Sequence, residues 1–290
     1  MRLRRVQLNE IPAVRRSAVD QATLTEATSI VEDVKTRGEQ AVLETSLRLG
    51  DIQPGDSLTL PLASLKAAYE GLDPHDRSAL TNAAIRIREF AAAQRRCVHA
   101  MQVEIPGGTA GHDIAPVEIA GCYAPGGRFP LPSSVLMTAI TAREAGVETV
   151  WVASPKPAQV TLAAAYIAEV DGFMQVGGAQ AIGALAYGAG SIPACDAVVG
   201  PGNRWVTAAK QIVSGSVAID MLAGPSELVV MADHTADPRI VAADLLAQAE
   251  HDDDAVAILV TSSDSLVTQV ESELEKQLLG LPTRSTAERG

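Results

Sequence analysis

The chain has 290 residues and a formal net charge of −12 at pH 7, and 47% of its residues are hydrophobic while only 3% are aromatic. This length and composition predict a folded, soluble protein and exclude extensive disorder. The acidic balance argues against nucleic acid or an anionic membrane surface as a partner, because both require a basic footprint on the protein.

The N-terminus carries the main basic cluster of the sequence. We expect residues 1–18 to form a solvated arm, because no apolar segment follows the arginines as a secretory signal would require. No uncharged apolar run is long enough for a membrane span. The arginines of the cluster are Arg2, Arg4, Arg5, Arg15 and Arg16.

The cysteines indicate a reducing compartment. Cys97, Cys122 and Cys195 are far apart in the sequence, and none belongs to a CxxC pair. A disulfide framework or a thiolate zinc cluster therefore has no support, and we expect a cytoplasmic protein.

The part from Leu24 to Arg96 is helical in pattern. Apolar residues recur there at spacings of three and four, and Pro74 opens a long second stretch. We expect no strand in this part.

From Val117 onwards, short apolar runs alternate with helical patterns. Four βα units in succession predict a parallel, doubly wound sheet with crossover helices. The predicted strands are Val117–Tyr123, Thr149–Ala153, Phe173–Val176 and Ala197–Val199, and the predicted helices are Pro132–Ala145, Ala158–Glu169, Ala179–Tyr187 and Asn203–Val213.

A second α/β run follows the turn-rich stretch Gly224–Ser226. It predicts strands at Leu228–Ala232 and Val256–Val260, and helices at Asp237–His251 and Ser265–Leu279. After Gly280 the sequence becomes polar, and we expect no regular element there.

Three glycine-rich loops follow predicted strands: Tyr123–Gly127, Gly177–Gln180 and Gly200–Asn203. Because parallel sheets bind ligands at the carboxyl ends of their strands, these loops suggest a phosphate-bearing ligand such as a nucleotide. Alternatively, the glycines only make the tight turns between strand and helix. Neither a GxGxxG sequence nor a P-loop is present.

Gln248 and His251 end a helix otherwise rich in alanine and leucine. Residues three apart share a helical face, so both side chains can point at one metal ion or substrate. Alternatively, His251 only interacts favourably with the helix dipole. Ser226 is interpreted as a turn or ligand hydroxyl, because Leu228 replaces the glycine that a nucleophile elbow requires.

Several blocks, in this order and spacing, resemble the histidinol dehydrogenase family between Leu24 and Ser262. The blocks are Tyr123-Ala-Pro-Gly-Gly, Pro132-Ser-Ser-Val-Leu-Met, Gly177-Gly-Ala-Gln-Ala-Ile, Gly200-Pro-Gly-Asn, Ile219-Asp-Met-Leu-Ala-Gly-Pro-Ser-Glu and Ala243-Asp-Leu-Leu-Ala-Gln-Ala-Glu-His.

The resemblance implies an α/β fold with two Rossmann-like parallel-sheet domains, of which the first is discontinuous and incomplete at its C-terminus. After the arm of residues 1–18, residues 19–121 plus 228–290 would form the first domain and residues 122–227 the second. It also implies a homodimer.

The chemistry implied by the resemblance is a zinc-assisted, four-electron oxidation of L-histidinol to L-histidine through histidinal, with NAD as hydride acceptor. Tyr123, Gln180 and Asn203 would contact NAD. Ser226, Gln248 and His251 would contact the substrate, and Gln248 and His251 would also ligate zinc.

The family's catalytic Glu-His pair and its remaining zinc ligands correspond to positions beyond Gly290. We therefore expect a truncated member, with no catalytic residue in these 290 residues, that binds zinc poorly and has little turnover. Two alternatives stay open. Arg128 beside the first glycine loop would suit a dehydrogenase of another polar alcohol, such as a sulfonated diol, and a non-catalytic remnant would only bind nucleotide.

Overall fold

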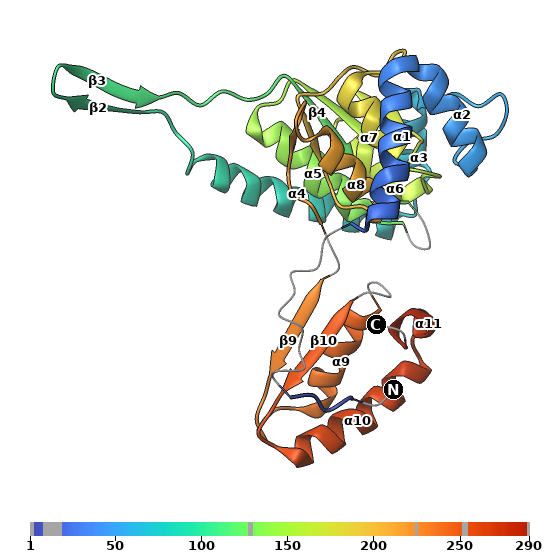
Figure 1. Ribbon diagram of the computed structural model, residues 1–290, viewed down its shortest axis with the longest axis vertical. Helices are drawn as coiled ribbons and strands as arrows, with labels where there is room; N and C mark the ends of the chain where they lie inside the picture. The colour runs from blue at the N-terminus through green and yellow to red at the C-terminus, as the bar shows by residue number, and fades with distance from the viewer. Residues whose placement is uncertain (1–2, 8–18, 127–129, 224–225, 251–254, 289–290) are drawn as a thin grey trace. The chain divides into compact units, whose positions relative to one another are not determined.

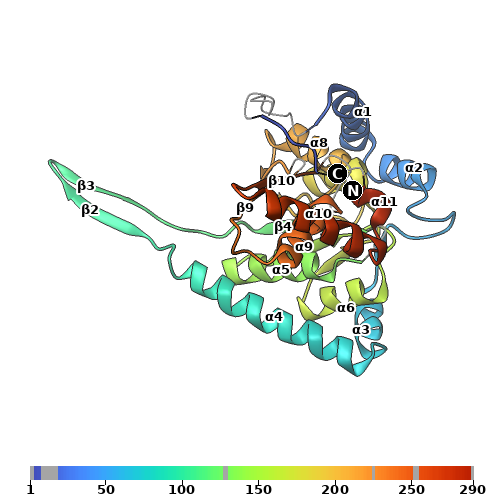
Figure 2. The same ribbon diagram turned by 90° about the horizontal axis from the view of Figure 1, so that it is seen from below.

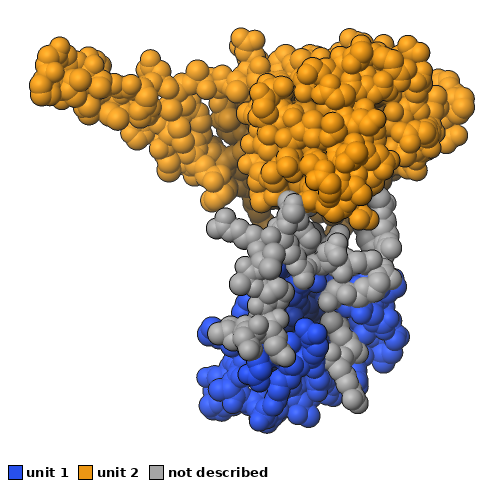
Figure 3. Space-filling model, in the orientation of Figure 1, with its two compact units in different colours: residues 1–17, 224–290 blue, residues 18–223 orange. Residues whose placement is uncertain are grey.

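The computed structural model describes residues 3–7, 19–126, 130–223, 226–250 and 255–288. It divides into two compact units, coloured separately in Figure 3: unit 1 holds residues 1–17 and 224–290, and unit 2 holds residues 18–223. None of the helices in the described ranges combines the length and the apolar character that a membrane crossing needs.

The N-terminal part of unit 2 is helical, as its sequence periodicity predicts. Asp20 caps the first helix by accepting a hydrogen bond from the main-chain N–H of Thr23. The prediction that this part lacks strands is wrong at β1 (Thr59–Leu60), which pairs antiparallel with β6. Two residues are too few to show a strand periodicity. The helices are α1 (Gln21–Arg37), α2 (Glu39–Leu49), α3 (Leu62–Glu70) and α4 (Pro74–Arg95).

The larger sheet lies in unit 2, and its described strands run in the order β1-β6-β5-β4-β7-β8. All neighbouring pairs from β6 to β8 are parallel. The predicted parallel, doubly wound sheet is therefore confirmed. Its parallel strands are β4 (Ile119–Tyr123), β5 (Thr149–Ala153), β6 (Gly172–Met174), β7 (Ala197–Val199) and β8 (Ala218–Ile219).

Helices cover both faces of this sheet (Figures 1 and 2). Helices α3 to α6 pack on one face, and α1, α2, α7 and α8 pack on the other. Side chains of β5 alternate between the two cores: Val150 and Val152 lie in one, and Trp151 and Ala153 contact the other. The crossover helices are α5 (Pro132–Ala145), α6 (Gln159–Ile167), α7 (Gly178–Tyr187) and α8 (Arg204–Val213).

The sheet changes winding direction at β4. Strand β5 pairs with one edge of β4 and β7 with the other, and α5 and α8, which follow β4 and β7, lie on opposite faces. The carboxyl ends of β4 and β7 therefore form the topological switch point, which is where open α/β sheets bind their ligands.

A hairpin that the sequence analysis did not predict follows α4. Strands β2 (Met101–Ile105) and β3 (Gly108–His112) pair antiparallel around Pro106 and Gly107, and Gly107 has a φ of 90°. Figures 1 and 2 both show the hairpin projecting away from the sheet, and every residue of both strands is exposed. The glycines of β3 hide its strand character, since glycine has low β-propensity.

Unit 1 is a smaller α/β body. Strands β9 (Glu227–Met231) and β10 (Val256–Val260) pair in parallel, and α9 (Pro238–Ala249) and α10 (Asp264–Leu279) pack together to form its core. The expectation of no element after Gly280 is wrong, because α11 (Arg284–Ala287) forms there and buries Ala287 in this core. A single turn is too short to show helical periodicity.

The described residues of the N-terminal arm lie in unit 1. Leu3 donates its main-chain N–H to a carboxylate oxygen of Glu271, and its side chain packs against the core. Arg5 pairs with Asp264 at 2.5 Å, with both side chains exposed. The arm is therefore solvated at Arg5, as expected, whereas Leu3 packs against the core of unit 1.

The two units differ from the domains assigned in the sequence analysis. The boundary after Ala223 lies close to the expected one after residue 227. Residues 19–121, however, pack with residues 122–223, because α1 contacts α7 and α8 while α4 contacts α5. Periodicity locates a helix without specifying the sheet that it covers. The grouping of residues 19–121 with 228–290 in one discontinuous domain stays a prediction.

Candidate functional site

Tyr123 lies at the carboxyl end of β4 and is buried. Its hydroxyl accepts a hydrogen bond from the main-chain N–H of Gly178 over 3.3 Å, which joins the end of β4 to the start of α7. Burial raises the pKa of Tyr123 from its usual 10.0 to about 12. The phenol is therefore neutral at physiological pH and keeps its proton as a donor.

Gln180 lies in the first turn of α7 and is 1% exposed. Its Nε2 donates to a carboxylate oxygen of Asp51 over 3.1 Å, and the same oxygen accepts the main-chain N–H of Gly177 over 3.0 Å. Among the described residues, Oε1 of Gln180 has no hydrogen-bonding partner. Because an unpaired buried acceptor costs free energy, this atom is suited to receive a donor from a ligand.

Asp51 holds the candidate site together, and no sequence pattern predicted it. It follows α2 and stands outside every glycine loop, yet it orients the amide of Gln180 and binds the Gly177 loop. Its place between α2 and β1 gives no local signal, since the contact joins residues that are 129 positions apart.

The glycine loops meet one another at this edge of the sheet. A Cβ on Gly126 would lie 1.9 Å from the carbonyl oxygen of Pro155, and one on Gly200 would lie 2.0 Å from that of Tyr123. Gly200 also has a φ of 118°. Close packing between loops accounts for these two glycines, so Gln180 and the switch point are the features that indicate a ligand.

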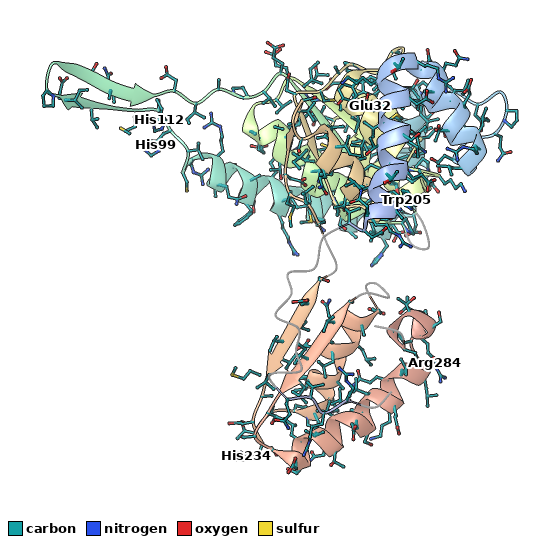
Figure 4. The ribbon with its side chains drawn as sticks, in the orientation of Figure 1. Glu32, His99, His112, Trp205, His234 and Arg284 are labelled. Carbon is teal, nitrogen blue, oxygen red and sulfur yellow. The ribbon has the colours of Figure 1, made fainter. Side chains whose placement is uncertain are left out.

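Asn203 caps helix α8. Its Oδ1 accepts the main-chain N–H groups of Trp205 over 3.0 Å and Val206 over 3.2 Å, and the side chain is exposed. Figure 4 labels Trp205 in the first turn of this helix. The amide nitrogen of Asn203 is the donor that a ligand at this helix end could use.

The structure connects the three predicted NAD contacts. Tyr123 reaches the loop of Gln180 through Gly178, and its carbonyl borders Gly200 in the loop that carries Asn203. All of these residues belong to unit 2.

Ser226 and Gln248 lie side by side in unit 1. Nε2 of Gln248 donates to the main-chain oxygen of Ser226 over 2.6 Å and to its Oγ over 2.8 Å. With Nε2 held in this way, the amide oxygen of Gln248 is the atom that can ligate a cation. The structure thus joins two predicted substrate contacts that are 22 residues apart.

His251 and Arg128 lie outside the described residues. Among the residues that are described, no group of three or more His, Cys, Asp or Glu side chains could hold a metal ion. The described part of unit 1 therefore supplies Gln248 as a candidate ligand, and a metal would require further ligands such as His251.

Comparisons with known proteins agree with one another. The family model for histidinol dehydrogenase matches residues 14–290. A histidinol dehydrogenase of Ralstonia nicotianae is 44% identical over 287 residues, which cover 96% of this chain and 65% of that protein. One of Aquifex aeolicus is 43% identical over 261 residues, which cover 90% of this chain and 61% of that protein.

The crystal structure of histidinol dehydrogenase from Elizabethkingia anophelis matches with a TM-score of 0.86 and 34% sequence identity, over 97% of this chain and 65% of that one. This match supports the α/β fold described above. The chain spans between 61% and 65% of the length of these relatives.

Proposed function

The chain belongs to the histidinol dehydrogenase family, and we propose from this premise that it acts in the NAD-dependent, zinc-assisted oxidation of L-histidinol to L-histidine through histidinal. That reaction belongs to histidine biosynthesis. The observation that carries the proposal is the family match over residues 14–290. The unpaired, buried Oε1 of Gln180, in the helix whose first residue binds Tyr123 at the end of β4, supports a ligand at this edge of the sheet.

The edge of unit 2 fits a dinucleotide. Gln180 offers an oriented acceptor for a ribose hydroxyl or a carboxamide N–H, and Tyr123 offers a neutral hydroxyl. Asn203 stands at the N-terminus of α8, where the helix dipole favours an anion such as a phosphate. NAD, when bound, supplies the hydride acceptor. Tyr123, Gln180 and Asn203 thus bind and orient it.

The residues of unit 1 take the substrate and the metal. Gln248 and His251 would hold zinc, and Ser226, held by Gln248, would contact L-histidinol together with both. Zinc, when bound, supplies a Lewis acid that gathers the nitrogen atoms of the substrate. The fit is partial, since Gln248 alone of the two proposed ligands is described.

We extend the proposal to a homodimer in the cytoplasm. Cys97, Cys122 and Cys195, all within the described ranges, are free thiols. Free thiols are the usual state in a reducing compartment.

Calorimetric titration of the chain with NAD tests the proposal. We expect saturable binding, and Gln180→Met should weaken it about tenfold, because the accepted hydrogen bond is lost. Gln211→Met is the matched control, since Gln211 is an exposed glutamine on α8. Absence of NAD binding, or equal affinity in Gln180→Met, would overturn the assignment.

The substrate is tested by titrating the NAD-loaded chain with L-histidinol or a sulfonated diol in the presence of Zn²⁺. Stronger binding of L-histidinol is expected. Preference for the sulfonated diol would support a dehydrogenase of another polar alcohol. If the chain binds NAD but neither alcohol, the result would support a remnant that only binds nucleotide.

A further inference from the structure

Lys210 is a buried lysine that the proposed function does not use. It lies in α8, and its side chain is 3% exposed. Its Nζ donates to the main-chain oxygen of Gly200 over 3.0 Å and forms an ion pair with Asp220. A buried ammonium is costly unless it is paired and fully hydrogen-bonded, so these contacts are required to keep it there.

Asp220 follows β8 and binds the other side of the same loop. One carboxylate oxygen accepts the main-chain N–H of Gly200 over 2.8 Å, and the other accepts Lys210 and the main-chain N–H of Met221 at 2.7 Å. The pair therefore binds both main-chain polar groups of Gly200, its N–H and its carbonyl.

Gly200 is the point where the loop bends towards Asn203. Its φ of 118° is rarely adopted by other residues, and its Cα packs against the main chain of Tyr123. The peptide groups on both sides of this bend are thus fixed by one ion pair.

Helix α8 also binds the chain segment beyond Asp220. The hydroxyl of Thr207, one helical turn from Lys210, donates to the main-chain oxygen of Ala223 over 2.9 Å. Lys210 and Thr207 thus attach both ends of residues 220–223 to α8.

We propose that Lys210 and Asp220 are positioning residues, which hold the Gly200–Asn203 loop in the conformation that presents Asn203 to a dinucleotide. The contribution of this ion pair to NAD binding rests on the proposed function. Its effect on the conformation of the loop does not. The side chain of Asp220 is 34% exposed, so the ion pair is partly solvated. Such pairs contribute little to stability by themselves, so stability alone does not explain its presence.

Hydrogen exchange tests the hold on the loop without any ligand. The reporters are the main-chain amides of Trp205 and Val206, which donate to Asn203. In Lys210→Met we expect these amides to exchange at least about tenfold faster, while the amides of β4 and β5 keep their rates. A merely structural role would instead accelerate exchange throughout the sheet.

Asp220→Asn provides a second variant, because it keeps the side-chain volume and one acceptor while it removes the charge. Lys276→Met is the control: Lys276 pairs with Glu273 on the surface of α10, outside unit 2. Unchanged exchange at Trp205 and Val206 in both Lys210→Met and Asp220→Asn would overturn the proposal, as would acceleration that spreads evenly over the sheet.

NAD affinity then separates the two claims. If the unsubstituted chain binds NAD, Lys210→Met should weaken binding about tenfold at a temperature where it is fully folded, and Lys276→Met should not. Equal affinity in Lys210→Met would overturn the role in binding. If the unsubstituted chain binds no NAD but exchange accelerates as described, the hold on the loop stands and the proposed function fails.

Discussion

The side-chain amide of Gln180 donates a hydrogen bond to Asp51, which lies 129 residues earlier in the chain, over 3.1 Å. This contact leaves the amide oxygen of Gln180 as the acceptor without a partner among the described residues. The segment between α2 and β1 therefore contributes to the candidate cofactor site, although the glycine loops that mark this site come later in the sequence.

Asp51→Ala should weaken NAD binding about tenfold and lower the free energy of unfolding by about 1–3 kcal/mol. The substitution leaves the buried Nε2 of Gln180 and the N–H of Gly177 without their acceptor. Calorimetry and urea unfolding measure the two effects. Asp56→Ala is the control, since Asp56 accepts a hydrogen bond from Gln53 within its own turn. Equal losses in both variants would contradict this role of Asp51.

Gly200→Ala should destabilise the chain by about 2–4 kcal/mol, because it combines an unfavourable φ with overlap against the main chain of Tyr123. Gly215→Ala is the matched control. A Cβ on Gly215 would meet no atom within 4 Å, so we expect a change below about 1 kcal/mol there. Equal midpoints of thermal unfolding for the two variants would disprove the close approach at Gly200.

Alkaline pH should destabilise unit 2. Burial raises the pKa of Tyr123 from 10.0 to about 12, and burial raises the pKa values of Cys122 and Cys195 from 9.0 to about 12. Between these values the unfolded chain releases protons that the folded chain retains, so stability falls as the pH rises.

The contribution of Tyr123 to this loss of stability at alkaline pH can be measured separately. In Tyr123→Phe, the loss of unfolding free energy between pH 10 and pH 12 should be smaller by about 2 kcal/mol, which corresponds to the raised pKa of the phenol. Urea unfolding at both pH values measures this loss. An equal loss in the variant and in the unsubstituted chain would show that the pKa of Tyr123 is not raised in the folded protein.

Ser226 and Gln248 should differ in what they bind. Ser226→Ala should weaken L-histidinol about tenfold and leave zinc affinity unchanged, whereas Gln248→Leu should weaken both, because Gln248 is a proposed metal ligand that also holds Ser226. Ser272→Ala, at an exposed serine of α10, is the control. If Gln248→Leu binds zinc with the same affinity as the unsubstituted chain, Gln248 is not a zinc ligand.

Local sequence patterns predicted the bounds of β5, α5 and β7 in the larger sheet, and of β10 in unit 1. The three strands are short apolar runs, and Pro132 and Gly146 limit α5. The β2–β3 hairpin was not predicted because both strands are exposed and β3 contains two glycines. Strand β1 was not predicted because only its pairing with β6 defines it.

Recognisable sequence blocks nominated Tyr123, Gln180 and Asn203 as candidate residues, and their contact with NAD stays a prediction. Asp51 and Lys210, which hold this candidate site, stand in no such block, and Asp220 stands in one without having been singled out as a candidate. Their contacts depend on the tertiary fold: Asp51 reaches a loop more than a hundred residues later, and Lys210 faces inward on a helix whose pattern suggested no partner for it.

Hydrogen exchange of the chain with and without saturating NAD would show whether the carboxyl edge of the unit 2 sheet binds NAD. We predict slower exchange in three segments, residues 123–126, 177–180 and 200–206, with little change in the β2–β3 hairpin. Binding without protection of these segments, or protection centred elsewhere, would contradict the account.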